Sequence, residues 1–218
     1  IVNFTISINF MPTISVSEDV KRELLKFASE LQMKLGRRVD FDEAIRFLLM
    51  YRRKKNPRLL IEACTSGDVE DALRELYEEG KMLAIDAGVI IELPLQSKAG
   101  IAIRNALLDE IVDAHTTKIA ITEVKYILCR KFGWKESCKR VEKLLSSGYL
   151  SVYRTDLLID LAAKYKCERG ISLADCFVLA LAKKLGCKAL FARRDQELVK
   201  EMDKKKFNIE ILFLEDFV

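Results

Sequence analysis

The pattern of apolar and polar positions at the start of the chain predicts a short strand. Residues 13–17 alternate in polarity and place Ile14 and Val16 on one face. Residues 2–8 alternate in the same way, and Met11 interrupts the two patterns. The ten residues before Met11 are therefore either an upstream extension or an earlier strand.

Two helices are expected to follow this strand. Ser17 is a suitable N-cap residue, and apolar positions then recur at helical spacing as far as Gly36. Asp40, with Glu43 three residues later, matches a capping box at the start of the second helix. Pro57 ends that helix because it cannot donate the next backbone hydrogen bond.

The pattern changes after residue 80, where short apolar runs alternate with amphipathic helical segments. The expected strands are residues 82–85, 118–120, 150–153, 189–191 and 209–213. Strands separated by helices predict an α/β domain, with a parallel sheet flanked by helices on both faces. We therefore expect three parts, namely a strand-helix-helix module in residues 1–57, a helical linker in residues 58–80 and an α/β domain in residues 81–218.

Composition and charge narrow the function classes. Half of the 218 residues are apolar, which excludes a disordered chain, and no apolar run approaches the roughly 18 residues of a membrane span. Without a recognisable targeting segment, a cytoplasmic protein is expected. The net charge of +4 divides into +5 for residues 1–60 and −1 for residues 61–218. The first segment is the part suited to a polyanionic partner.

Cysteine and histidine usage excludes several kinds of site. The six cysteines include no CxxC pair, and the single histidine, His115, cannot complete the usual zinc spacings. A nucleophilic site of the Ser-His-Asp or Cys-His kind would have to use His115 itself. Carboxylates are therefore the expected carriers of any chemistry.

Four acidic residues lie at boundaries of the expected elements. Asp86, Glu123 and Asp195 follow expected strands, and Asp175 lies in the first turn of a helix. In parallel sheets the functional crevice lies outside the carboxyl ends of the strands, so these acids are candidate site residues. Each also has a structural alternative: Asp175 belongs to a capping box, Glu123 starts a helix, and Asp195 is a loop acid. Asp86 has no such alternative in the sequence.

Four stretches, taken in order, carry a family resemblance. They are residues 83–90, 121–128, 172–186 and 190–198. Together they resemble the PIN domain, the fold of VapC-type toxin ribonucleases and related metal-dependent nucleases. The resemblance implies that Asp86, Glu123, Asp175 and Asp195 are catalytic residues that bind Mg²⁺ or Mn²⁺, with Asp86 as a direct ligand. Hard oxygen ligands suit these ions, which activate water for phosphodiester hydrolysis.

Two positions depart from the PIN pattern. The family usually has Thr or Ser directly after the first aspartate and a hydroxyl residue two positions before the fourth acid. This chain has Ala87 and Arg193 there. The departures predict a site of reduced activity. Arg193 and Arg194 are expected either to contact RNA phosphates or, for Arg193, to serve as a counter-ion to the acids.

The strand-helix-helix pattern of residues 1–57 resembles a ribbon-helix-helix module of the VapB-type antitoxin kind. The resemblance implies a homodimer whose outward-facing strand residues, here Thr13, Ser15 and Ser17, enter operator DNA. Those positions carry hydroxyls only, without the Arg, Lys, Asn or Gln that read bases strongly. A dimerisation or docking module without DNA binding is the alternative.

An antitoxin-like segment therefore precedes a toxin-like domain in one chain. We hypothesise that residues 50–80 pack on the α/β domain and that one cation of this segment limits access to the acids, the alternative being a solvated helix end. The cations are Arg52, Arg53, Lys54, Lys55 and Arg58. The predicted function is a metal-dependent endoribonuclease of toxin-antitoxin type that is held in check in cis by its N-terminal segment. The alternative is a DNA- or RNA-binding regulator with a weakened PIN domain.

Overall fold

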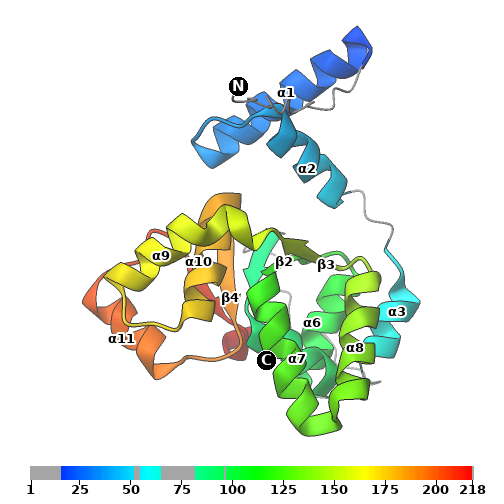
Figure 1. The fold of residues 1–218 in the computed structure, drawn as a ribbon, viewed down its shortest axis with the longest axis vertical. Coiled ribbons are helices and arrows are strands. Elements are labelled where there is room, and N and C mark those ends of the chain that lie inside the picture. The colour runs from blue at the N-terminus through cyan, green and yellow to red at the C-terminus, as the bar shows by residue number, and fades with distance from the viewer. Residues whose placement is uncertain (1–15, 52–54, 65–81, 96, 218) are drawn as a thin grey trace, which may run out of the picture. The chain divides into compact units, whose positions relative to one another are not determined.

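The protein was studied as a computed structural model that describes residues 16–51, 55–64, 82–95 and 97–217 (Figure 1). The chain divides between Leu49 and Met50 into two compact units. No helix in these described ranges is long and apolar enough to cross a membrane.

The first unit contains the two predicted helices, α1 (Glu18–Leu35) and α2 (Phe41–Tyr51). Gly36 ends α1 in a left-handed conformation with φ of 62°. The Asp40 carboxylate accepts the Glu43 backbone N–H at 2.8 Å, as predicted for a cap. Ser17 differs from expectation because its hydroxyl bonds to Asp19 and leaves the helix N-terminus uncapped.

The predicted strand before α1 lies almost entirely outside the described residues. Thr13 and Ser15 fall there, as do residues 2–8, whereas Ser17 is described and exposed. The helical half of the predicted module is therefore present, and its ribbon stays a prediction.

The second unit contains the predicted α/β fold, which is confirmed. Its five strands are β1 (Met82–Ile85), β2 (Asp113–Thr117), β3 (Leu150–Tyr153), β4 (Lys188–Phe191) and β5 (Ile211–Phe213). They form one parallel sheet in the order β3-β2-β1-β4-β5.

The second strand was predicted in the wrong place. Residues 118–120 form the first turn of helix α7, and β2 lies immediately before them. The β2 sequence is mostly polar, so its pattern gave no strand signal. The strand is nevertheless buried, and Thr116 donates its hydroxyl to the Ile85 carbonyl at 3.1 Å.

Helices cover both faces of the sheet (Figure 1). The helices are α3 (Pro57–Ala63), α5 (Ala87–Glu92), α6 (Lys98–Leu108), α7 (Lys118–Phe132), α8 (Trp134–Ser146), α9 (Ile159–Glu168), α10 (Leu173–Leu185) and α11 (Gln196–Lys204), with short 3₁₀ helices η1 (Leu93–Leu95), η2 (Thr155–Leu158) and η3 (Leu214–Phe217). Leu83 and Ile85 of β1 belong to a core shared with α3 and α5–α8. On the other face, α10 packs on β1, β2 and β4, where neighbouring Ala84 and Ala189 leave room for it.

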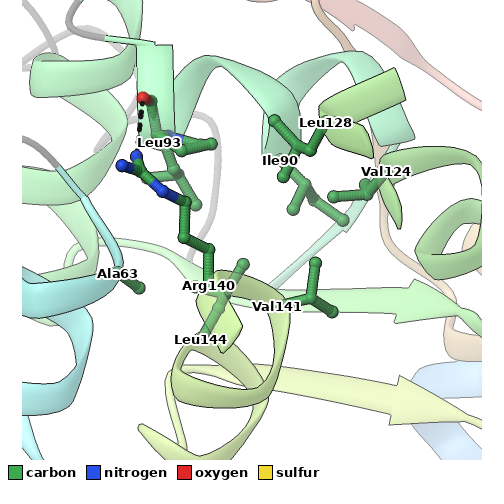
Figure 2. Close-up of a pocket in the computed structure, with 9 residues that line it drawn as sticks. Ala63, Ile90, Leu93, Val124, Leu128, Arg140, Val141 and Leu144 are labelled. Carbon is green, nitrogen blue, oxygen red and sulfur yellow. Dashed lines mark hydrogen bonds between the residues drawn. The ribbon is translucent and has the colours of Figure 1, made fainter. Parts of the chain in front are cut away.

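Helix α3 packs on this sheet domain, although it precedes the expected domain boundary. The Asn56 N–H donates to the Ser147 carbonyl at 2.7 Å, and Lys143 of α8 pairs with Glu62 at 2.6 Å. Leu60 is fully buried. Figure 2 shows Ala63 of α3 beside a small cavity that is also lined by Arg140 of α8. The Arg140 guanidinium donates to the Pro94 carbonyl at 3.5 Å.

Candidate active site

The strand order places a topological switch point between β1 and β4. The chain moves from β1 outward through β2 to β3, then returns to the other side of β1 to form β4 and β5. Ligand crevices of open parallel sheets lie at such a point, outside the carboxyl ends of the strands. Asp86 directly follows β1, and its backbone N–H bonds to Leu190 of β4 at 3.0 Å. Asp86 therefore lies at the switch point.

The connections bring the other three predicted acids to the same edge of the sheet. Helix α7 begins where β2 ends and carries Glu123 in its second turn. Helix α10 leads back to the start of β4, so its first turn, with Asp175, lies at the carboxyl edge. Asp195 follows β4 and precedes α11.

Three of the four acids also take part in helix capping. Asp86 Oδ2 accepts the Gly88 N–H at 2.8 Å, and Asp195 Oδ1 accepts the Glu197 N–H at 2.7 Å. The Asp175 backbone N–H donates to Ser172 Oγ at 3.0 Å. Asp86 and Asp195 are therefore N-cap residues, a role that the sequence did not reveal for either.

The carboxylates influence one another electrostatically. The pKa of Asp86 is raised to about 6, mainly by burial and also by the charges of Asp175 and Glu123, against the lowering effect of the Gly88 N–H. Burial also raises the pKa of Asp175, with contributions from Asp195 and Glu123. These couplings show that the four acids share one electrostatic environment.

None of the four acids forms an ion pair with a lysine or arginine in the described part of the chain. Other acids around this edge do have cationic partners. Asp156 pairs with Arg154 at 2.5 Å, and Glu92 pairs with Arg193 at 3.3 Å. The site is thus a group of carboxylates without a cationic partner among the described residues, in which Asp86 and Asp175 are partly desolvated. Such an arrangement is costly unless a cation binds.

The two arginines of the predicted site make structural contacts. Arg193 is bound by Glu92 and not by the four acids, and its side chain stays 76% exposed. Arg194 pairs with Asp216, donates its backbone N–H to Glu215 at 2.8 Å and stacks on Phe213. Arg194 therefore fixes the loop after β4 to η3.

Gly88 is a site residue that sequence reasoning missed. A Cβ atom at this position would lie 2.9 Å from the Ala192 Cβ and 3.0 Å from Asp86 Oδ2. Any larger residue would therefore displace either the loop after β4, which carries Ala192, or the Asp86 carboxylate. A glycine two residues after an acid at a strand end was the available signal.

Comparison with known families agrees with this geometry. The family model described as the PIN domain matches residues 83–205. The chain belongs to the PIN domain family. PIN domains are generally nucleases, that is, hydrolases. The match begins inside β1, so α1, α2 and α3 precede the matched PIN region.

Two solved structures resemble this PIN domain chain. VapC20 of Mycobacterium tuberculosis, described as a sarcin-ricin loop cleaving toxin, has a TM-score of 0.44 and 18% identity over 55% of this chain and 94% of its own. PAE2754 of Pyrobaculum aerophilum has a TM-score of 0.42 and 18% identity over 69% of this chain and 94% of its own. No curated protein matches the chain significantly.

Proposed function

We propose that the protein is a metal-dependent endoribonuclease of toxin-antitoxin type, and that Asp86, Glu123, Asp175 and Asp195 are its catalytic residues. The observation that carries this proposal is the group of uncompensated carboxylates at the switch point of a PIN fold. RNA phosphodiesters are polyanions, so an acidic site can accept them only when a cation intervenes.

The donor set suits Mg²⁺ or Mn²⁺. The described residues hold no group of three or more His, Cys, Asp or Glu side chains arranged to bind a metal ion. Mg²⁺ commonly uses one or two carboxylates and retains several waters, so Asp86 and Asp175 suffice as ligands, with Glu123 and Asp195 around them. A bound divalent ion supplies an activated water and stabilises the leaving oxygen.

The chain's own residues orient this site. The Gly88 N–H fixes one oxygen of Asp86, and the Ser172 hydroxyl fixes the backbone at Asp175. Thr116 ties β2 to the last residue of β1. These contacts fix the Asp86 carboxylate and the backbone at Asp175 before any ligand arrives, a preorganisation that favours catalysis.

Cleavage of a single-stranded RNA by the full chain tests the proposal. We expect cleavage with Mg²⁺ or Mn²⁺, none with EDTA, and a loss of at least a hundredfold in Asp86→Asn and Asp175→Asn. Asp109→Asn changes an exposed acid before β2, at the opposite edge of the sheet, and serves as the control. A calorimetric titration with Mn²⁺ reports binding separately from cleavage.

The alternative function is an RNA- or DNA-binding regulator with a weakened site. It is favoured by Ala87, which lacks the usual hydroxyl, and by Arg193, whose partner is Glu92. Metal-independent binding of nucleic acid without cleavage by any preparation of the intact chain would support this alternative.

We propose further that residues 1–57 form a ribbon-helix-helix module that dimerises and binds operator DNA. We propose also that residues 1–54 restrain the nuclease in cis. Lys55 and Arg58, the two described cations of residues 50–80 that were candidates for this role, pair with other acids. Lys55 pairs with Glu110 before β2 at 3.3 Å, and Arg58 pairs with Glu62 at 2.8 Å. Faster cleavage by residues 55–218 than by the full chain would demonstrate the restraint.

A further inference from the structure

One exposed face of α7 forms a stripe that starts at the acidic site. Lys118, Thr122, Tyr126 and Arg130 are all exposed and recur every four residues. Residues at this spacing lie above one another on a helix, so the four side chains form a continuous row. Because α7 begins at the carboxyl edge, the stripe leads away from Glu123 and is called the α7 stripe below.

Tyr126 joins the stripe to the proposed catalytic residues. Its hydroxyl donates to Glu123 Oε1 at 3.4 Å, while its side chain remains 44% exposed. The Arg130 guanidinium lies 5.1 Å from the centre of the Tyr126 ring. Arg130 therefore supports one side of an aromatic ring that is still accessible to solvent.

The charges of the stripe complement a nucleic acid backbone. Lys118 and Arg130 stand on either side of Tyr126, separated by about 18 Å along the helix axis. Within the described residues neither cation forms an ion pair, although the charge of Lys118 lowers the pKa of Asp156. The stripe thus carries a cation, an aromatic ring and a second cation, beside four acids that form no ion pair with a lysine or arginine among the described residues.

We propose that the α7 stripe is a binding site for single-stranded RNA, with an unpaired base stacked on Tyr126 and phosphates held by Lys118 and Arg130. Aromatic platforms flanked by cations bind single strands in this way, with little sequence preference. The assignment rests on the proposed function, since it identifies the strand that the acidic site would cut. A base-paired duplex cannot present a base to the ring.

Binding measurements in the uncleaving background Asp86→Asn test the stripe. We expect Tyr126→Leu to weaken binding of a labelled single-stranded RNA about tenfold, whereas Tyr126→Phe keeps the ring and binds within about twofold of the parent. Arg130→Gln should weaken binding and reduce the salt slope by about one. Lys131→Gln and Trp134→Leu change an exposed neighbouring cation and a 64% exposed aromatic outside the stripe, and both should bind normally.

The chain's single tryptophan allows a direct measurement of stacking. In the double variant Trp134→Phe/Tyr126→Trp the only indole lies at position 126. Single-stranded RNA should quench its fluorescence, duplex RNA should not, and neither should quench Trp134 of the parent. Normal binding by Tyr126→Leu, or no quenching at position 126, overturns the assignment. Quenching without cleavage by the unmutated chain would leave the stripe in place and remove the nuclease proposal.

Discussion

At the scale of single residues, Asp86 combines two requirements that oppose each other. Its carboxylate must be charged to bind a cation, yet it lies partly buried beside two other acids. The Gly88 N–H offsets only part of this cost. In the metal-free protein Asp86 is therefore expected to lower stability wherever it is ionised.

Asp86→Asn should consequently stabilise the metal-free protein near neutral pH while abolishing cleavage. The folded carboxyl has a pKa of about 6 against an ordinary 3.8, so the folded state binds the proton more tightly. Stability of the unmutated chain then falls as pH rises through this window, by up to about 3 kcal/mol. Urea unfolding in EDTA should show the variant more stable at pH 7.5 and equal to the unmutated chain at pH 3.5. The same difference in stability between the variant and the unmutated chain at pH 7.5 and at pH 3.5 would contradict a raised pKa of Asp86.

Gly88→Ala should destabilise the domain and impair cleavage, even though alanine favours helices. The added Cβ overlaps Ala192 and Asp86, and overpacking of this kind costs about 1–3 kcal/mol. Gly170→Ala is the milder comparison, because its Cβ would meet only the end of the Glu201 side chain, at 3.3 Å. Thermal unfolding and RNA cleavage measure the two effects, and a harmless Gly88→Ala would show that the loop after β4 can move.

At the scale of elements, α3 acts as part of the PIN domain body. It packs on α8 and α6, and Leu60 and Ala63 belong to the same hydrophobic core as Leu83 and Ile85 of β1. Its surface ion pair with Lys143 contributes little, since partly exposed pairs are worth about 0–1 kcal/mol. Burial of Leu60 supplies the stabilisation that holds the helix in place.

Leu60→Ala should therefore lower the free energy of unfolding of residues 50–218 by about 2–5 kcal/mol. Ile61→Ala removes a similar aliphatic side chain from the same helix, but Ile61 is 48% exposed and the change should cost well under 1 kcal/mol. Urea unfolding distinguishes the two variants. Equal small losses would mean that α3 leaves the domain easily.

Several elements could be predicted from the sequence because their apolar pattern matched their burial. The apolar runs at β1 and β3 coincide with the observed strands, and α1 ends at Gly36 as expected. Strand β2 could not be found in this way, since a buried strand of mostly polar residues has the sequence pattern of a loop. The same limit applies to Asp86 and Asp195, whose capping bonds depend on backbone N–H groups that a sequence does not display.

At the scale of the whole molecule, the excess positive charge and the acids lie in different parts of the chain. Residues 1–60 carry +5, whereas the four site acids all lie beyond residue 80. This separation suits two nucleic acid partners, one bound through charge alone and one cut in the presence of a metal ion. It also keeps the proposed DNA-binding activity independent of the divalent ion.

Removal of residues 1–54, which carry +3 of this excess, should accordingly abolish binding of duplex DNA and leave metal-dependent RNA cleavage in place. The full chain should bind duplex DNA in EDTA with an affinity that falls steeply as salt rises. Gel-shift titrations of the full chain and of residues 55–218, at several salt concentrations, measure this difference. Equal DNA binding by both chains would assign the basic surface to the PIN domain.

During synthesis, the nuclease domain cannot be complete until β4 has been made and can pair with β1. Leu83 of β1 pairs with Lys188 of β4, which is synthesised about 100 residues later. Synthesis at roughly 5–20 residues per second leaves an interval on the order of 5–20 s between them. Throughout that interval Asp86 has neither β4 nor Asp195 beside it. A cell making this protein therefore has several seconds in which a partner can meet the unfinished domain before it is able to cut.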